Sequence, residues 1–183
     1  YQEANSYAKD RRQFKRSIQD IPLVYEMLTN MRVSIDAARS MLYETSSIVD
    51  IKEGIENSIE LHPERRADLK SDLSRYSKYA SLFTPLIKRF AADMANQVCY
   101  DAIQVHGGVG FTKEFDAERH YRDVRITSIY EGTSQLQVVG AIGGVVGGVV
   151  FDRLDDYENE NDFSEVKALH ESAQELRACL KAA

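Results

Sequence analysis

The sequence contains no tryptophan, only three prolines and only two cysteines among its 183 residues. Cys99 and Cys179 stand far apart and the four histidines are scattered, so the closely spaced ligand pairs of metal-binding proteins are missing and we expect no metal site. We expect both thiols to be reduced, as is usual in a cytosolic protein. No apolar run is long enough to span a bilayer and no signal peptide is present, so we expect no membrane insertion and no targeting segment.

An excess of positive charge is also missing. The sequence has 23 lysines and arginines against 29 aspartates and glutamates, which gives a formal net charge of −6. This balance argues against nucleic acid as a partner. Hydrophobic residues make up 43% and charged residues 28%, as is typical of a globular protein. The length allows one domain with a substantial core and a piece of a second domain.

Apolar residues recur at steps of three and four over two long segments, which is the pattern of amphipathic helices. The first predicted helix covers about residues 22–50 and the second about residues 69–105. Between them, residues 51–63 are polar and contain Gly54 and Pro63, so we expect a loop there.

Three glycines after residue 105 should end the second long helix. A short charged helix is expected over residues 116–127, and a last helix of this set should start near Thr133 or Ser134. Glycine costs about 1 kcal/mol relative to alanine inside a helix, so we expect a second helix to approach this one closely. The glycines in question are Gly140, Gly143, Gly144, Gly147 and Gly148.

These elements predict an all-α fold, an up-and-down four-helix bundle with a helical C-terminal extension. The bundle should cover residues 1–150, and residues 151–183 should hold an acidic linker, at 152–163, and the start of an additional helical region. No strand pattern competes. The chain begins at Tyr1 inside a helical pattern and stops without a helix cap, so we expect it to be part of a longer protein.

The segment Ile129–Gln135, with the sequence IYEGTSQ, places one carboxylate between an aromatic residue and a glycine. Gly132 permits unusual backbone angles and the close approach of a ligand. Thr133 or Ser134 can cap the helix that follows, whose first N–H groups can then face a polar ligand. A glutamate near a helix N-terminus is also electrostatically favourable without any catalytic role. Taken alone, the tripeptide Tyr130–Gly132 favours this structural interpretation of Glu131.

A second unusual segment, Gln104–Phe111, has the sequence QVHGGVGF. Its glycines are consistent with an ordinary helix end, but with an amide before them and an aromatic after them they also expose a backbone that can lie against a flat ring. The pattern is not the dinucleotide fingerprint, because no strand precedes it. Considered alone, His106 favours a structural hydrogen bond over ligand binding. We expect the charged cluster at Arg122, Asp123 and Arg125, which precedes the Glu131 loop, to form a buried or half-buried ion pair that fixes this loop.

Four segments together resemble the C-terminal helical domain of the flavin-dependent acyl-CoA dehydrogenases. They are Arg11–Phe14, Gln104–Phe111, Tyr121–Asp123 and Ile129–Gln135, and they occur in family order and at about family separation. The resemblance covers roughly residues 1–150. It implies an enzyme with an N-terminal helical domain, a middle β domain and this bundle, in which FAD lies between the last two domains and reaches a neighbouring subunit.

The resemblance implies that Glu131 removes the α proton of an acyl-CoA thioester while the β hydrogen leaves as hydride to the flavin, which gives a trans-2-enoyl-CoA. Tyr130 and Gly132 would border the acyl chain and the thioester. Arg11 would meet the FAD pyrophosphate of a neighbouring subunit, with Phe14 packed nearby. The other implied FAD contacts are Gln104, Val105, His106, Gly107 and Gly108 on the adenosine side, and Thr133, Ser134 and Gln135.

The same resemblance implies an acyl-CoA substrate, an electron-transfer flavoprotein or a similar acceptor, and a homodimer or homotetramer. It places the protein in the bacterial cytoplasm, or in the mitochondrial matrix of a eukaryote. The FAD site would be incomplete in these residues, so we expect this chain by itself to be inactive. An acyl-CoA oxidase and a non-catalytic, flavin-binding helical relative remain as alternatives.

Two features depart from the family pattern. Many members have a glycine after the phenylalanine and a glutamine several residues later, where this sequence has Lys15 and Pro22, so the FAD contact at that place does not carry over. The loop at 51–63 and the tail after residue 150 are longer than in the smaller dehydrogenases and resemble those of large subfamilies with an extra C-terminal helical region.

Overall fold

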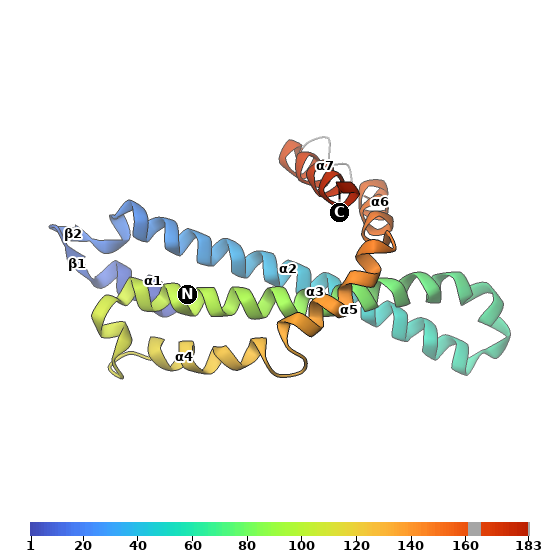
Figure 1. The fold of residues 1–183 in the computed structure, drawn as a ribbon, viewed down its shortest axis with the longest axis horizontal. Coiled ribbons are helices and arrows are strands. Elements are labelled where there is room, and N and C mark those ends of the chain that lie inside the picture. The colour runs from blue at the N-terminus through green and yellow to red at the C-terminus, as the bar shows by residue number, and fades with distance from the viewer. Residues whose placement is uncertain (161–165, 183) are drawn as a thin grey trace. The chain divides into compact units, whose positions relative to one another are not determined.

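The structure is a computed structural model that describes residues 1–160 and 166–182 (Figure 1). The prediction of an all-α protein is confirmed, because the described residues form α-helices and short 3-10 helices apart from two strands of two residues each. In chain order the elements are α1 (Gln2–Asp10), β1 (Arg12–Gln13), β2 (Arg16–Ser17), η1 (Ile18–Asp20), α2 (Pro22–Leu61), η2 (Pro63–Arg65), α3 (Arg66–His106), η3 (Gly107–Phe111), α4 (Ala117–Val124), η4 (Arg125–Ser128), α5 (Ser134–Val146), α6 (Val149–Glu160) and α7 (Lys167–Ala182).

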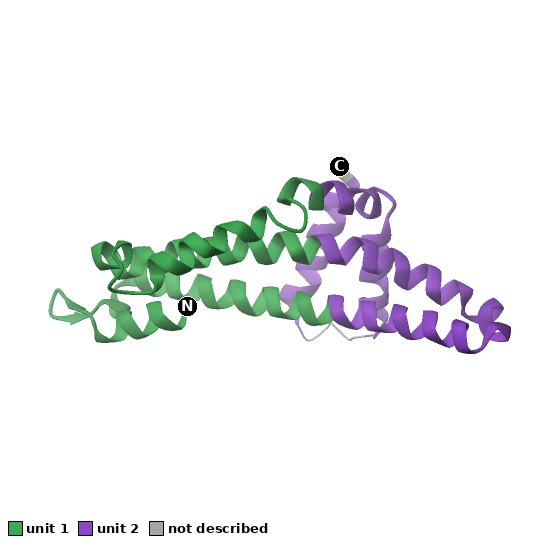
Figure 2. Cartoon of the chain, turned by 90° about the horizontal axis from the view of Figure 1, so that it is seen from below, with its two compact units in different colours: residues 1–44, 86–137 green, residues 45–85, 138–183 purple. Residues whose placement is uncertain are grey.

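The chain divides into two compact units, coloured green and purple in Figure 2. Unit 1 consists of Tyr1–Glu44 and Leu86–Gln137, and unit 2 consists of Thr45–Pro85 and Val138–Ala183. The long helices α2 and α3 therefore each contribute one part to both units. Within the described residues no single helix is long and apolar enough to cross a membrane; the pair α5 and α6, bent by 67° at its break, passes by length and composition alone.

The core of unit 1 forms where α1 and η1 pack on α2 and α3. Ala4 and Ala8 of α1 are fully buried, and these small side chains leave room for the long helices to approach. Met31 of α2 is 1% exposed, and burying such a side chain contributes about 1.5–3 kcal/mol. Ser17 connects the β hairpin to α1, since its hydroxyl donates a hydrogen bond of 2.6 Å to the carbonyl of Ala8.

In unit 2, two glycines of α5 lie against α3. A Cβ added at Gly144 would be 3.1 Å from Leu82 Cδ1, and one added at Gly140 would be 3.6 Å from Pro85 Cβ. Leu82 is 1% exposed, so this contact is part of the core. The expected close approach of a second helix is therefore confirmed at these two glycines. The next ones end the helix, because Gly148 has a φ of +79° between α5 and α6.

The prediction of a loop over residues 51–63 was wrong, since α2 continues to Leu61. Gly54 lies inside the helix and is exposed, and the Lys52–Glu56 ion pair of 2.8 Å spans it. Such a pair supports a helix by a few tenths of a kcal/mol, and the cost of one glycine, about 1 kcal/mol, is too small to end a helix of this length. The connection between α2 and α3 is short, because η2 begins at Pro63 and α3 follows at Arg66.

The acidic linker expected over residues 152–163 was also wrong as far as residue 160, because α6 covers Val149–Glu160. Its carboxylates have partners within unit 2: Tyr79 donates to Asp156 at 2.8 Å, and Arg177 of α7 donates to Asp155 at 2.6 Å. Residues 161–163 lie outside the described residues. The additional helical region expected after the linker corresponds to α7, which covers Lys167–Ala182.

No strand was expected, but β1 and β2 form a small antiparallel hairpin in which Arg12 lies opposite Ser17. Its two loop residues, Phe14 and Lys15, have φ values of +52° and +65°. A two-residue loop of this kind needs positive φ at both positions, which glycine and asparagine adopt most easily. Lys15 therefore adopts a left-handed conformation at a cost that a glycine would not carry.

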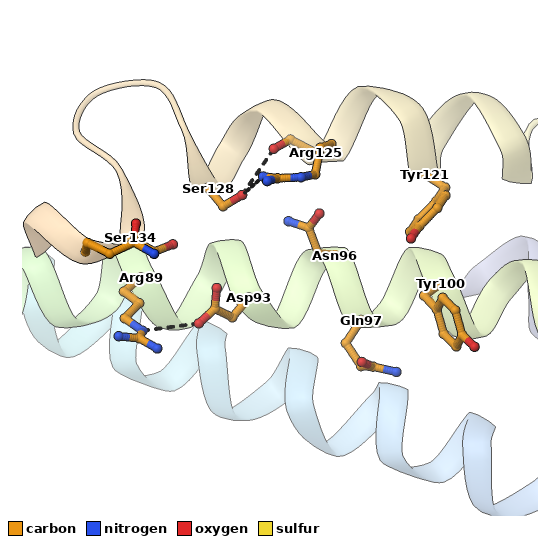
Figure 3. Close-up of a pocket in the computed structure, with 10 residues that line it drawn as sticks. Arg89, Asp93, Asn96, Gln97, Tyr100, Tyr121, Arg125, Ser128 and Ser134 are labelled. Carbon is orange, nitrogen blue, oxygen red and sulfur yellow. Dashed lines mark hydrogen bonds and ion pairs between the residues drawn. The ribbon is translucent and has the colours of Figure 1, made fainter. Parts of the chain in front are cut away.

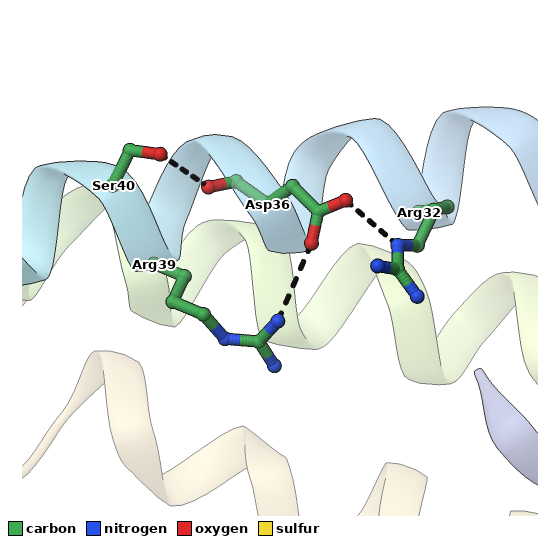
Figure 4. Close-up of polar contacts among 4 residues, drawn as sticks. All are labelled: Arg32, Asp36, Arg39 and Ser40. Atoms are coloured by element: carbon green, nitrogen blue, oxygen red, sulfur yellow. Dashed lines mark hydrogen bonds and ion pairs between the residues drawn. The ribbon is translucent and has the colours of Figure 1, made fainter.

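One polar cluster lies on the exposed surface of α2 in unit 1 (Figure 4). Asp36 accepts hydrogen bonds from Arg32 Nε at 2.7 Å and from Arg39 Nη1 at 3.3 Å, and Ser40 Oγ donates to the Asp36 carbonyl at 3.0 Å. The hydrogen bond to Asp36 raises the pKa of Arg32 above its usual value. Exposed pairs of this kind support the helix locally but contribute little to the stability of the fold.

Candidate active site

Glu131 lies on a tight turn between η4 and α5. Its φ is +52° and that of Gly132 is +88°, so two consecutive residues are left-handed. Glycine adopts this conformation freely, whereas a glutamate there is strained by roughly 1–2 kcal/mol. Both Glu131 and Tyr130 are exposed, the latter to 53%. The turn therefore presents the carboxylate at the surface of unit 1, where a ligand or another part of the protein can reach it.

Two side chains hold the backbone of this turn. Lys88 of α3 donates a hydrogen bond of 2.6 Å from Nζ to the Gly132 carbonyl. Gln137, in the first turns of α5, donates from Nε2 to the carbonyls of Glu131 at 3.0 Å and Gly132 at 3.3 Å. The Lys88 ammonium also lies 5.7 Å from the centre of the Tyr130 ring. Sequence reasoning missed Lys88, which stands 44 positions before Gly132 in no recognisable motif.

The predicted cap of α5 is confirmed at Thr133, whose Oγ1 accepts a hydrogen bond of 3.4 Å from the backbone N–H of Leu136. Beside the cap, Ser134 and Gln135 line a polar groove with residues of α3, α4 and η4 (Figure 3). Ser134 Oγ is buried and has no hydrogen-bond partner among the described residues, although a buried hydroxyl normally has one. The remaining lining residues are Arg89, Asp93, Asn96, Gln97, Tyr100, Tyr121, Arg125 and Ser128.

The groove beside Ser134 has a surplus of positive charge. Arg89 pairs with Asp93 at 3.2 Å, and Arg125 donates to the hydroxyl of Ser128. Asn96 fixes the opposite wall, since its Nδ2 lies 3.3 Å from Thr127 Oγ1 of η4. Two arginines against one aspartate favour an anionic or strongly polar ligand, and the unpartnered Ser134 hydroxyl offers such a ligand a hydrogen bond.

Arg11 and His106 line a second groove, with Phe115 and several acidic side chains. The His106 ring is 4% exposed and stacks on the Tyr7 ring at 4.5 Å. Its Nδ1 lies 2.7 Å from the Ala102 carbonyl. The His106 side chain therefore makes a structural hydrogen bond, as we expected when this residue was considered alone. The acidic lining residues of this groove are Glu3, Asp10, Glu114 and Asp116.

The other residues implied as FAD contacts near this groove differ in exposure. Phe14 is 76% exposed, whereas Val105 is 4% exposed and belongs to the core of unit 1. Gln104 is exposed and donates to Tyr100 Oη at 3.1 Å. Gly107 and Gly108 are exposed, and a Cβ at either would meet no atom within 4 Å. Their bare backbone is accessible to a flat ring, as the sequence pattern suggested.

The two sets of implied FAD contacts lie at opposite ends of α4. In Figure 1 the Gly107–Phe111 segment lies before the start of α4, while the turn with Glu131 follows η4, beyond the other end of α4. Arg11 and His106 thus share one groove, and Ser134 and Gln135 share another.

Two further expectations concern charged groups. Arg122 does pair with Glu118 at 3.0 Å and with Asp123 at 3.8 Å, but the predicted burial was wrong, because the Arg122 side chain is 62% exposed at the outer surface of α4. Among the described residues, one group has the spacing of metal ligands. It is formed by Glu3, Asp116 and His120, whose ligand atoms lie within 4.8 Å of one another, but all three are exposed and nothing further points to an ion.

Comparison with known proteins gives a consistent result. Residues 1–62 and 65–140 match the family model described as "Acyl-CoA dehydrogenase, C-terminal domain". The chain is 34% identical over 135 residues to the caffeyl-CoA reductase-Etf complex subunit CarC of Acetobacterium woodii, which covers 74% of this chain and 29% of that protein. It is 35% identical over 153 residues to the 3-methylmercaptopropionyl-CoA dehydrogenase of Ruegeria pomeroyi, covering 78% of this chain and 24% of that protein.

A solved structure is also similar, the acyl-CoA dehydrogenase complexed with FAD from Bacillus anthracis. The TM-score is 0.64 at 31% identity, covering 80% of this chain and 25% of that one. This chain thus spans between about a quarter and three tenths of its relatives' length. The Ruegeria pomeroyi and Bacillus anthracis proteins cover more of this chain than the CarC subunit does. The matched part is also a smaller share of each of them, so both are longer than CarC.

Proposed function

Because the chain belongs to the acyl-CoA dehydrogenase family, whose C-terminal helical domain it contains, we propose that it is the part of an FAD-dependent acyl-CoA dehydrogenase that carries the catalytic base. The observation that carries this proposal is the Glu131 turn, in which a left-handed glutamate is held at the surface beside a polar groove.

In this proposal Glu131 is the general base. Its carboxylate takes a proton from the α carbon of an acyl-CoA thioester, and the backbone around it helps to polarise the thioester carbonyl. Tyr130 and Gly132 border the acyl chain and the thioester; Tyr130 is exposed and Gly132 is half-buried. FAD, when bound, would supply the hydride acceptor for the β hydrogen, and the product would be a trans-2-enoyl-CoA.

The residues present fit FAD. Ser134 Oγ is a buried polar atom without a partner, and with Thr133 and Gln135 it would hold the cofactor at the groove beside the base. Gly107 and Gly108 offer bare backbone at the other groove. Gln104, Val105 and His106 would line that side of the cofactor, Val105 and His106 through the backbone because their side chains are buried, and Arg11 and Phe14 would meet it from the hairpin end.

We propose that the two grooves serve two different copies of FAD, so that each cofactor is bound by two subunits of a homodimer or homotetramer. The separation of the two sets of residues along α4 supports this arrangement. So does the apolar surface of α5, where Val139 is 67% and Val146 81% exposed. Exposed apolar patches of this kind commonly mark contacts between proteins.

The electron acceptor in this proposal is an electron-transfer flavoprotein or a similar protein, in the cytoplasm or the mitochondrial matrix. One similar protein is named as a subunit of a reductase-Etf complex and another as a dehydrogenase. Glu131 can act in either direction, because the carboxyl that receives the α proton during dehydrogenation returns it during reduction. The rate at which oxygen oxidises the reduced flavin separates a dehydrogenase from an oxidase.

The test is the change Glu131→Gln in the full-length protein, with Glu26→Gln on the exposed face of α2 as the matched control. Saturated acyl-CoA thioesters of several chain lengths are supplied with an artificial electron acceptor, and 2-enoyl-CoA is measured by mass spectrometry. Removing a general base should lower turnover about 10²–10⁴-fold, while the control should match the unmodified protein. Turnover that survives Glu131→Gln would exclude Glu131 as the base.

A further inference from the structure

The Glu131 turn is tied to a helix that is distant in sequence. We propose that Lys88 is a positioning residue for the base: by binding the Gly132 carbonyl, it fixes the turn against α3 and so sets the direction of the Glu131 carboxylate. This inference rests on the proposed function, since it assigns a second residue to the same reaction.

The geometry of Lys88 is suited to this role. Its Nζ lies 2.6 Å from the Gly132 oxygen, and the ammonium is 5.7 Å from the centre of the Tyr130 ring. Lys88 is half-buried, so its hydrogen bond is less exposed to competition from water than one at the surface. A charged donor makes a stronger hydrogen bond than a neutral one, and one ammonium thus contacts residues on both sides of Glu131.

The turn needs an external partner because of its backbone. With Glu131 at φ +52° and Gly132 at +88°, the turn departs from helical geometry. Gln137 donates to both carbonyls, but its bond to Gly132 is long, at 3.3 Å. Lys88 supplies the short bond to that oxygen.

The two donors also differ in what they connect. Gln137 lies six residues after Glu131 and belongs to α5, the helix that directly follows the turn, so its hydrogen bonds connect the turn only to α5. Lys88 belongs to α3, which forms the floor of the groove lined by Ser134 and Gln135. Its bond therefore fixes the position of the base relative to the groove. A small error in the placement of a base can cost a factor of about 100 in rate, so the anchor matters for chemistry more than for binding.

The experiment uses the full-length protein loaded with FAD and the thioester 3,3-dimethylbutanoyl-CoA. Its α carbon carries protons, but its β carbon carries no hydrogen, so no hydride can leave. In D2O, Glu131 can remove an α proton and return a deuteron, and mass spectrometry measures this exchange without any net redox reaction. Lys88→Met removes the donor and Lys88→Arg retains a charged one, while Lys70→Met alters an exposed lysine of the same helix as the control.

We expect Lys88→Met to slow the exchange by about 10- to 100-fold while the thioester concentration that half-saturates the rate and the FAD content stay within about threefold of the unmodified protein. Lys88→Arg should restore most of the rate, and Lys70→Met should have no effect. A residue that merely stabilised the fold would change FAD content and saturation as well, and would not separate the rate from binding.

The outcomes distinguish this inference from the proposed function. If the unmodified protein does not exchange α protons, or if Glu131→Gln still does, the proposed function fails. If those two behave as expected but Lys88→Met exchanges at the unmodified rate, the positioning role is refuted. Should Lys88→Met not retain FAD, Lys88→Arg and Lys88→Gln decide: exchange should be slower with the neutral glutamine donor, and rates equal to that of the unmodified protein in both would refute the inference.

Discussion

The conformation of Gly132 leads to a quantitative prediction for the change Gly132→Ala. The added Cβ would stand 2.7 Å from Gln137 Nε2, well inside van der Waals contact, on a backbone with φ +88°. Because the obstructing atom is the end of a flexible side chain, Gln137 can move away. That movement breaks its hydrogen bonds to the carbonyls of Glu131 and Gly132, so the change loses both the free backbone conformation and part of the support of the turn.

The expected cost has two parts. An alanine in the left-handed region costs about 1–2 kcal/mol more than a glycine. The two bonds from Gln137 contribute roughly 0.5 kcal/mol each, at the low end for neutral hydrogen bonds, because water can reach an exposed turn. Together these terms predict that Gly132→Ala lowers the free energy of unfolding by about 2–3 kcal/mol.

Urea unfolding followed by circular dichroism measures this difference, and Gly54→Ala is the matched control. Gly54 lies within α2, where an added Cβ meets no atom within 4 Å. Alanine there should raise the unfolding free energy by about 0.5–1 kcal/mol, because it favours the helix more than glycine does. The same substitution should therefore have opposite signs at the two positions. A loss below about 0.5 kcal/mol for Gly132→Ala would refute the strain argument for the turn.

Three further predictions follow from other parts of the chain. Burial and the hydrogen bond to Asp156 raise the pKa of Tyr79 above that of the unfolded chain. The stability that Tyr79 confers is therefore complete below pH 10 and is lost as the pH rises above 10. Urea midpoints between pH 8 and 11 should fall more steeply in the unmodified protein than in Tyr79→Phe, and equal slopes would contradict this. Lys15→Gly should stabilise the β hairpin, where φ is +65°, by about 1 kcal/mol, and an unchanged or lower melting temperature would count against the strain at that position. The 183 residues alone should bind no stoichiometric FAD and catalyse no turnover, and a flavin spectrum that co-purifies with them in equal amount would show the site to be complete.

The helices of this fold were predictable because their signal is local. The step of three and four residues identified α2 and α3, and the glycines after His106 marked the end of α3. The extent of α2 was not predictable in this way, since Gly54 and the polar residues around it resemble a loop. A helix in progress tolerates one glycine, and only Pro63 gives a signal that the chain must turn.

The helical structure of the acidic segment depended on partners far along the chain. Asp156 meets Tyr79 of α3, which is 77 positions away, and Asp155 meets Arg177 of α7. Neither partner can be inferred from the composition of the segment, which resembles that of a linker.

In the candidate site, too, local features were predictable from the sequence and contacts with distant residues were not. A carboxylate next to Gly132, followed by a capping Thr133, was visible in the sequence, and the structure gives both the backbone angles and the cap that this pattern predicts. The support from Lys88 was not visible, because a hydrogen bond to a backbone carbonyl places no demand on the residue types beside the lysine. The buried packing of the His106 ring depended in the same way on Tyr7, which lies at the other end of the domain sequence.

The most direct test of the central claim is an anaerobic titration of the full-length protein with a panel of acyl-CoA thioesters, followed by flavin absorbance. We predict that one class of thioester bleaches the flavin and that Glu131→Gln abolishes the bleaching without loss of bound FAD. A flavin that no acyl-CoA reduces, or one that is reduced equally well in Glu131→Gln, would contradict the assignment of this turn as the catalytic centre.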